Sequence, residues 1–163
     1  MKGIIFSPMS IMSFPNKIVT RRLVKRRKKP LYNIGDVCYV KERWRVPEEL
    51  EKYSPSGMPG DVLIDYRIGS DTEESSGLVS WGRWRNALFL PARFARFFIK
   101  IEDVRMESLL DITHEDAVRE GCDSTKEYLD LWDAIHGDGE FCSRNNPNVW
   151  RIHFSHKKGD EIK

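Results

Sequence analysis

The positions of two clear helix patterns in this sequence limit the folds that the chain can adopt. Thr113 can cap a first helix that ends at Gly121, and Ser124 can cap a second that ends at Gly137. The two helices lie close together late in the chain and do not alternate with strands. Helices grouped in this way are typical of an α+β domain whose sheet is antiparallel or mixed.

Each of these predicted helices carries further local signals. Asp116 and Glu127 stand three residues after the capping residues, where the acid of a capping box belongs. Apolar residues at helical spacing define the buried face of the second helix. They are Tyr128, Leu131, Trp132 and Ile135.

Short segments with the composition of strands surround the two helices. Residues 37–40 are apolar on both faces and follow a turn-forming segment, so they predict a buried strand. Other strands are predicted over residues 3–6, 18–24, 62–68, 97–106 and 149–154. A chain of 163 residues can bury one core of its own. We therefore expect a single domain over residues 1–156, in which the sheet closes into a small β-barrel, and a flexible tail over residues 157–163.

The charge of the chain is concentrated near its N-terminus. Residues 1–30 contain nine Lys and Arg and no acidic residue, and seven of the nine residues from Arg21 to Lys29 are basic. Such a density attracts phosphate, although a solvated loop is the alternative. The candidate ligand-binding residues in this run are Arg21, Arg22, Lys25, Arg26 and Arg27. Neighbours on an extended segment point to opposite faces, so only one of the first two can line a cleft, and we expect Arg22.

A second candidate binding segment combines aromatic and basic residues. The segment consists of Trp81, Gly82, Arg83, Trp84 and Arg85. Indole rings and guanidinium groups stack on nucleobases, so this spacing favours nucleic-acid binding. The alternative is a packing element, because tryptophan is usually buried.

Metal, cofactor and membrane functions are not indicated. His153 and His156 lie on opposite faces of a predicted strand, and the acids around residue 116 are explained by helix capping, so we expect no metal and no cofactor. The three cysteines are widely spaced and odd in number, which fits a reducing, cytoplasmic setting. No apolar run reaches the roughly 18 residues of a membrane span.

The order of several segments resembles the ASCH domain family, above all its bacteriophage and prophage members. The resemblance covers nearly the whole chain and rests on the combination of segments. They are MKGIIFS, Lys17–Arg22, YNIGDVCYVKERW, residues 85–105 with LPAR, ITHEDAVREG and NPNVWRIHF. ASCH domains belong to the PUA-like superfamily, so the resemblance implies a small β-barrel with peripheral helices that is associated with RNA or modified nucleobases.

The family signature, Gly-x-Lys-x-x-Glu-x-Arg, places Lys17 and Arg22 at its Lys and Arg positions. Pro15 stands where the family has Gly, and Thr20 where Glu is common. A branch similar to the bacterial N4-acetylcytidine amidohydrolase uses Lys and Thr at this spacing with a Glu from the later helix. The resemblance therefore implies Lys17, Thr20 and Glu120 as catalytic residues.

These three residue types could support metal-independent amide hydrolysis. A hydroxyl needs a neighbouring base, which a lysine can provide if burial or nearby cations lower its pKa, and a carboxyl group can pass a proton to the leaving amine. The alternative places Thr20 in a strand, Lys17 in a solvated loop and Glu120 on a helix surface. The first expectation is binding of RNA or a modified pyrimidine nucleoside, with DNA not excluded. Hydrolysis of an N4-acylated cytidine and a phage accessory role through protein contacts are the alternatives.

Overall fold

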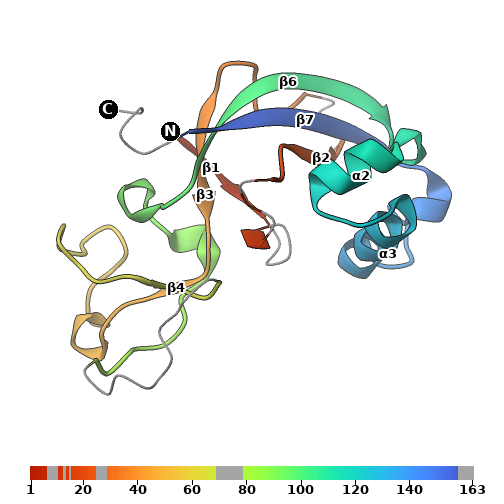
Figure 1. Cartoon of the computed structure of the whole chain (residues 1–163). Coiled ribbons are helices and arrows are strands. Elements are labelled where there is room, and N and C mark those ends of the chain that lie inside the picture. Colours follow the sequence, from red (N-terminus) through yellow and green to blue (C-terminus); the bar gives the residue numbers. More distant parts are fainter. Residues whose placement is uncertain (7–10, 13, 15, 25–28, 69–78, 158–163) are drawn as a thin grey trace. The chain divides into compact units, whose positions relative to one another are not determined.

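The strands and helices of the computed structural model form a mixed α+β structure (Figure 1). The structure describes residues 1–6, 11–12, 14, 16–24, 29–68 and 79–157. These residues fall into two compact units. The first unit comprises the described residues among 1–12 and 38–98, and the second comprises those among 13–37 and 99–157. The tail predicted over residues 157–163 lies outside the described residues except for Lys157, which is the last residue of a strand.

The described residues of the second unit form three strands and two α-helices. Strand β2 (Val19–Leu23) pairs antiparallel with β7 (Asn148–Lys157). Strand β6 (Phe98–Ser108), apart from its first residue, also belongs to this unit, as do helices α2 (His114–Glu120) and α3 (Thr125–His136). A buried apolar cluster joins the helices to the strands. Its members are Leu109, Ile112, Ala117, Cys122, Tyr128, Trp132 and Val149.

Both helices begin and end as their sequences predict. The Thr113 hydroxyl accepts from the amide of Asp116, and the Ser124 hydroxyl accepts from the amide of Glu127. Gly121 ends α2 with φ 91°, a left-handed conformation that glycine adopts without steric cost. The predicted burial of Ile135 is wrong, because this side chain is 59% exposed and lies outside the apolar cluster.

The first unit pairs β1 (Lys2–Ile5) in parallel with β3 (Val37–Lys41). It also contains a two-stranded antiparallel sheet of β4 (Trp44–Arg45) and β5 (Asp65–Tyr66). The strand predicted over residues 62–68 is therefore only two residues long. Val62 and Ile64 instead pack their side chains against a core of Trp44, Val46, Met58, Leu90 and Phe94.

Within the second unit the described strands lie in the order β6-β7-β2, and within the first unit β1 pairs with β3. A barrel requires its first and last strands to pair with each other. Among the described residues neither unit closes its strands into a barrel, so the expected β-barrel is not found. The mixed α+β class is confirmed.

Two further observations concern the cysteines and the helices. Cys38, Cys122 and Cys142 are buried free thiols. Among the described residues, no helix is both long and apolar enough to cross a bilayer.

Candidate functional site

Lys17 and Glu120 lie in direct contact, although 103 positions separate them in the sequence. The Lys17 Nζ atom lies 2.6 Å from Oε2 of Glu120 and also donates to the main-chain oxygen of Glu120 at 2.6 Å. Lys17 is 2% exposed and Glu120 is 5% exposed. The two groups therefore form a buried ion pair within the second unit, not a solvated loop residue and a surface acid.

Main-chain hydrogen bonds hold the residue after Lys17 in position. The amide of Ile18 donates to the carbonyl of Arg119 at 3.2 Å, and the amide of Phe154 donates to the carbonyl of Ile18 at 2.9 Å. The segment before β2 is thus fixed both to the end of α2 and to β7. This fixation explains why a lysine near residue 17 meets a glutamate of the later helix.

Thr20 is buried on β2 but faces differently from the Lys17–Glu120 pair. Side chains alternate along a strand, so Thr20 and Arg22 share one face of β2 and Arg21 takes the other. Arg21 is the strand residue that bonds to Glu120. In the part of the chain that the structure describes, no hydrogen bond joins the Thr20 hydroxyl to Lys17 or Glu120. The structure therefore brings together two of the three expected catalytic residues.

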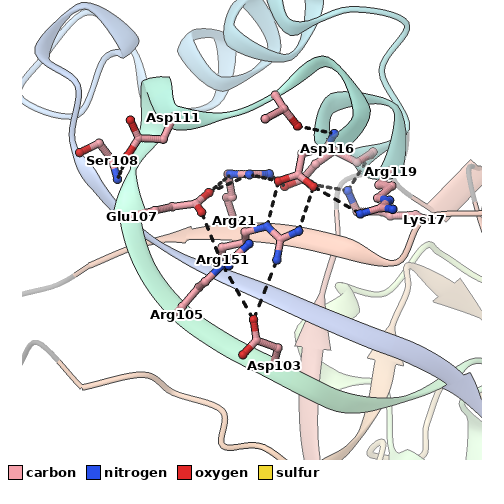
Figure 2. Close-up of polar contacts among 12 residues, drawn as sticks. Lys17, Arg21, Asp103, Arg105, Glu107, Ser108, Asp111, Asp116, Arg119 and Arg151 are labelled. Atoms are coloured by element: carbon pink, nitrogen blue, oxygen red, sulfur yellow. Dashed lines mark hydrogen bonds and ion pairs between the residues drawn. The ribbon is translucent and has the colours of Figure 1, made fainter.

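Four further charged residues surround this ion pair, and together with it they form a cluster of six (Figure 2). We call it the charged cluster; it consists of Lys17, Arg21, Glu107, Asp116, Glu120 and Arg151. Its three cations and three carboxylates come from β2, β6, α2, β7 and the segment before β2. The equal numbers balance the buried charge, which a protein interior requires.

Arg21 and Arg151 are joined by one carboxylate of α2. Arg151 donates from Nε and Nη2 to the two oxygens of Asp116, each at 2.9 Å. Arg21 donates to Asp116 at 2.6 Å, to Glu107 at 2.7 Å and to Glu120 at 3.3 Å. The two arginines are directly opposite in the register of β2 and β7, so both reach the same face of the sheet.

These contacts change the pKa values of the cluster. The hydrogen bond from Arg151 is the main reason that the pKa of Asp116 lies well below its usual range, and Arg21 acts in the same direction. The pKa of Arg151 is raised, chiefly by the same hydrogen bond. Burial alone would lower the pKa of Arg21, but Asp116, Glu120 and Glu107 together raise it. All three groups are therefore held in their charged forms.

The lowered pKa of Asp116 predicts a loss of stability in acid. A carboxyl group with a lower pKa in the folded state contributes stability above its unfolded pKa and loses it as the pH falls towards the folded value. We expect the free energy of unfolding of the wild type to fall steeply below about pH 4, and that of Asp116→Asn to fall less steeply. Urea unfolding across this pH range measures both slopes. Equal slopes would contradict the assignment.

Arg22 lies in a different environment from Arg21. Burial lowers the pKa of Arg22, against the opposing effects of Tyr32, Glu120 and Tyr128. Burial also raises the pKa of Tyr128 well above its usual value, so its phenol keeps its proton. The expectation that Arg22 and not Arg21 faces a ligand fits the full engagement of Arg21 in the charged cluster.

The remaining predicted binding residues are placed as follows. Lys25, Arg26 and Arg27 lie outside the described residues. The four residues of the aromatic and basic segment belong to the first unit and make their contacts there. They are Trp81, Arg83, Trp84 and Arg85.

The two tryptophans of this segment pack against an arginine of the same unit. The guanidinium of Arg45 lies 4.5 Å from the ring centroid of Trp84 and 5.3 Å from that of Trp81. Arg85 donates to the carbonyls of Glu51 and Tyr53, whereas the Arg83 side chain is 85% exposed. Much of the segment therefore serves packing within the unit.

Sequence reasoning missed the parts of Asp116 and Arg151 in the site. Asp116 was interpreted as a helix-capping acid, but its carboxylate binds two arginines and only its amide takes part in the cap. Arg151 is 6% exposed and lies between the apolar residues Trp150 and Ile152 of β7. A cation inside an apolar run was the available signal that a buried carboxylate faces it.

Comparisons with known proteins bear on the fold. Neither a protein-family model nor a curated protein matches the sequence. Among solved structures, the chain is similar to the crystal structure of protein EF3133 from Enterococcus faecalis V583, described by the family model DUF984. The TM-score is 0.51 at 9% sequence identity, and the match covers 97% of this chain and 82% of that chain. At this identity the likeness concerns the fold alone.

Proposed function

We propose that the chain is an ASCH-type protein that binds RNA or a modified pyrimidine nucleoside beside Lys17 and Glu120. The observation that carries the proposal is the 2.6 Å contact between these two side chains. They occupy the Lys position of the family signature and the Glu position of the amidohydrolase-like branch, and no local sequence pattern requires them to meet. Arg22 further supports the proposal, because it lies on β2 close enough to Glu120 for their charges to interact.

The energetics of a buried ion pair also favour a functional role. Removing two charges from water costs several kcal/mol per ion, and well-packed apolar residues are often equally or more stable at such positions. Lys17 and Glu120 are both almost fully buried. A chain that needed only stability would gain little from this pair, so binding chemistry is a reason to retain it.

The chemistry of the pair suits a cytosine-like base. A glutamate oxygen accepts a hydrogen bond from the exocyclic N4 amine of cytosine, and an ammonium group donates to ring or carbonyl acceptors. Single-stranded RNA presents these edges with the base unstacked. Arg22 interacts electrostatically with Tyr32, Tyr128 and Glu120, so a guanidinium group and two aromatic side chains lie near this carboxylate. Such groups stack on bases.

A second candidate function, hydrolysis of an N4-acylated cytidine, is favoured by the direct Lys17–Glu120 hydrogen bond. The Thr20 oxygen would attack the acyl carbon, and its proton would pass through the pair to N4 as the carbon–nitrogen bond breaks. The products of this step are cytidine and an acyl ester on Thr20. Water then cleaves the ester and releases the carboxylic acid. Thr20 and Arg21 lie on opposite faces of β2, so this reaction requires the Thr20 hydroxyl to reach the substrate from the face that does not carry Arg21.

Titration calorimetry with cytidine, N4-acetylcytidine, uridine and a short cytidine-rich RNA tests the proposal. We expect cytidine-type ligands to bind more tightly than uridine, and Glu120→Gln to weaken them roughly tenfold, as loss of one base-specific contact does. The matched control is Glu115→Gln, because Glu115 lies on the same helix but its side chain is 73% exposed.

The same samples distinguish binding from hydrolysis. Chromatography after incubation with N4-acetylcytidine detects cytidine if the acyl group is cleaved, and Thr20→Val should abolish that product. Binding without cytidine release supports the first function. If neither the nucleosides nor the RNA bind, or if Glu115→Gln weakens binding as much as Glu120→Gln, the proposal is wrong.

A further inference from the structure

A cavity of about 320 Å³ lies within the first unit, and none of the residues that line it belongs to the charged cluster. One side of the cavity is apolar and includes Ile5, Phe6 and Ile68. Cavities that bind small molecules span roughly 300–1,000 Å³ and combine apolar walls with a few polar groups. The volume therefore suits one small organic molecule.

The lining carries an excess of positive charge. Of the described residues that line it, three are cationic, Lys41, Arg43 and Arg67, and one is a carboxylate, Glu42. Glu42 is 2% exposed and bonds to Arg96, a residue outside the lining, whose Nε lies 2.9 Å from one carboxylate oxygen and whose Nη2 lies 2.6 Å from the other. Since Arg96 neutralises this carboxylate, the described part of the lining presents three cations and no unpaired carboxylate.

The backbone keeps these cations in fixed positions. The amide of Arg67 donates to the carbonyl of Arg43 at 3.0 Å, which places the two arginines side by side. Lys41 donates to the carbonyl of Leu88 at 2.7 Å. A Cβ atom at Gly3 would lie only 2.2 Å from Cε of Lys41, so the absence of a side chain at Gly3 leaves room for the lysine to cross β1.

We propose that this cavity binds a small organic phosphate. The apolar part of the ligand packs against Ile5, Phe6 and Ile68, and the phosphate lies among Lys41, Arg43 and Arg67. A phosphate monoester carries up to two negative charges and matches the fork of donors on a guanidinium, so three cations favour it over a monocarboxylate. This site is additional to the proposed nucleoside site and does not depend on it.

Phenyl phosphate is a suitable probe, because it combines an apolar ring with a phosphate dianion. We expect it to shift the amide signals of Ile68 and Ala87 in two-dimensional NMR spectra of the labelled full chain. Benzyl alcohol and inorganic phosphate, which each have half of this chemistry, should bind at least about tenfold more weakly. Arg43→Gln with Arg67→Gln should weaken phenyl phosphate by a similar factor. Both arginines are exposed, so these substitutions should leave the folded spectrum otherwise unchanged.

Two control variants separate the possible outcomes. Arg83→Gln removes an exposed cation of the same unit that is outside the lining and should leave binding unchanged. Glu120→Gln should also leave it unchanged, so failure of the nucleoside site does not affect this result. The proposal is overturned if phenyl phosphate causes no shifts in the millimolar range. It is also overturned if benzyl alcohol binds equally well, or if Arg83→Gln is as harmful as the double substitution.

Discussion

Asp116→Ala is expected to lower the free energy of unfolding by about 3–5 kcal/mol, as the loss of one partner from a buried ion pair does. The substitution removes a carboxylate that Arg21 and Arg151 share and leaves both guanidinium groups buried, at 5% and 6% exposure. Urea unfolding of the purified variant at neutral pH measures the change.

Asp130→Ala is the matched control for this experiment. Asp130 pairs with Lys126 on the surface of α3, where the side chains are 65% and 84% exposed, so its loss should cost less than about 1 kcal/mol. A similar, small effect of both substitutions would contradict the structural importance of Asp116.

The second large effect concerns Lys17. Lys17→Met is expected to cost about 3–5 kcal/mol, because Glu120 loses its closest cation while it stays buried. Adding Glu120→Leu should recover most of this loss, since apolar residues of similar volume often replace a buried pair without cost. The free energy of unfolding of the two single variants and the double variant gives the coupling between the positions.

This comparison also separates stability from function. The double variant should fold normally and yet fail to bind cytidine-type ligands. A double variant that is as unstable as Lys17→Met would indicate that the pair is needed for folding. A stable double variant that still binds these ligands with wild-type affinity would contradict the proposed function.

Local signals predicted the parts of the fold that depend on neighbouring residues. Thr113, Ser124 and Gly121 mark helix boundaries through hydrogen bonds within a few positions, and these boundaries are confirmed. Barrel closure depends on contacts between distant strands, which no local pattern specifies. The prediction for residues 62–68 was wrong for a related reason. Their alternation fits a strand, but in the described part of the chain they pair only with the two residues of β4.

The candidate site also has features that local sequence patterns predicted and features that they did not. Arg22 could be separated from Arg21 because alternation along an extended segment is a local property. Only the family resemblance predicted that Lys17 and Glu120 meet, because the periodicity of a helix does not indicate which residue of another segment the helix contacts. Arg151 could not be paired with Asp116, because their meeting depends on how α2 packs against β7, which no local pattern specifies.

The late position of β7 has a consequence for synthesis on the ribosome. Arg151 and the amide of Phe154, which donates to the carbonyl of Ile18, both belong to this strand. A growing polypeptide therefore cannot form the whole charged cluster until residues 148–157 leave the exit tunnel. Until then Asp116 lacks its bidentate partner, and native pairing must wait for contacts of long sequence separation. Premature termination before residue 148 should therefore yield a product that is cleared by proteolysis.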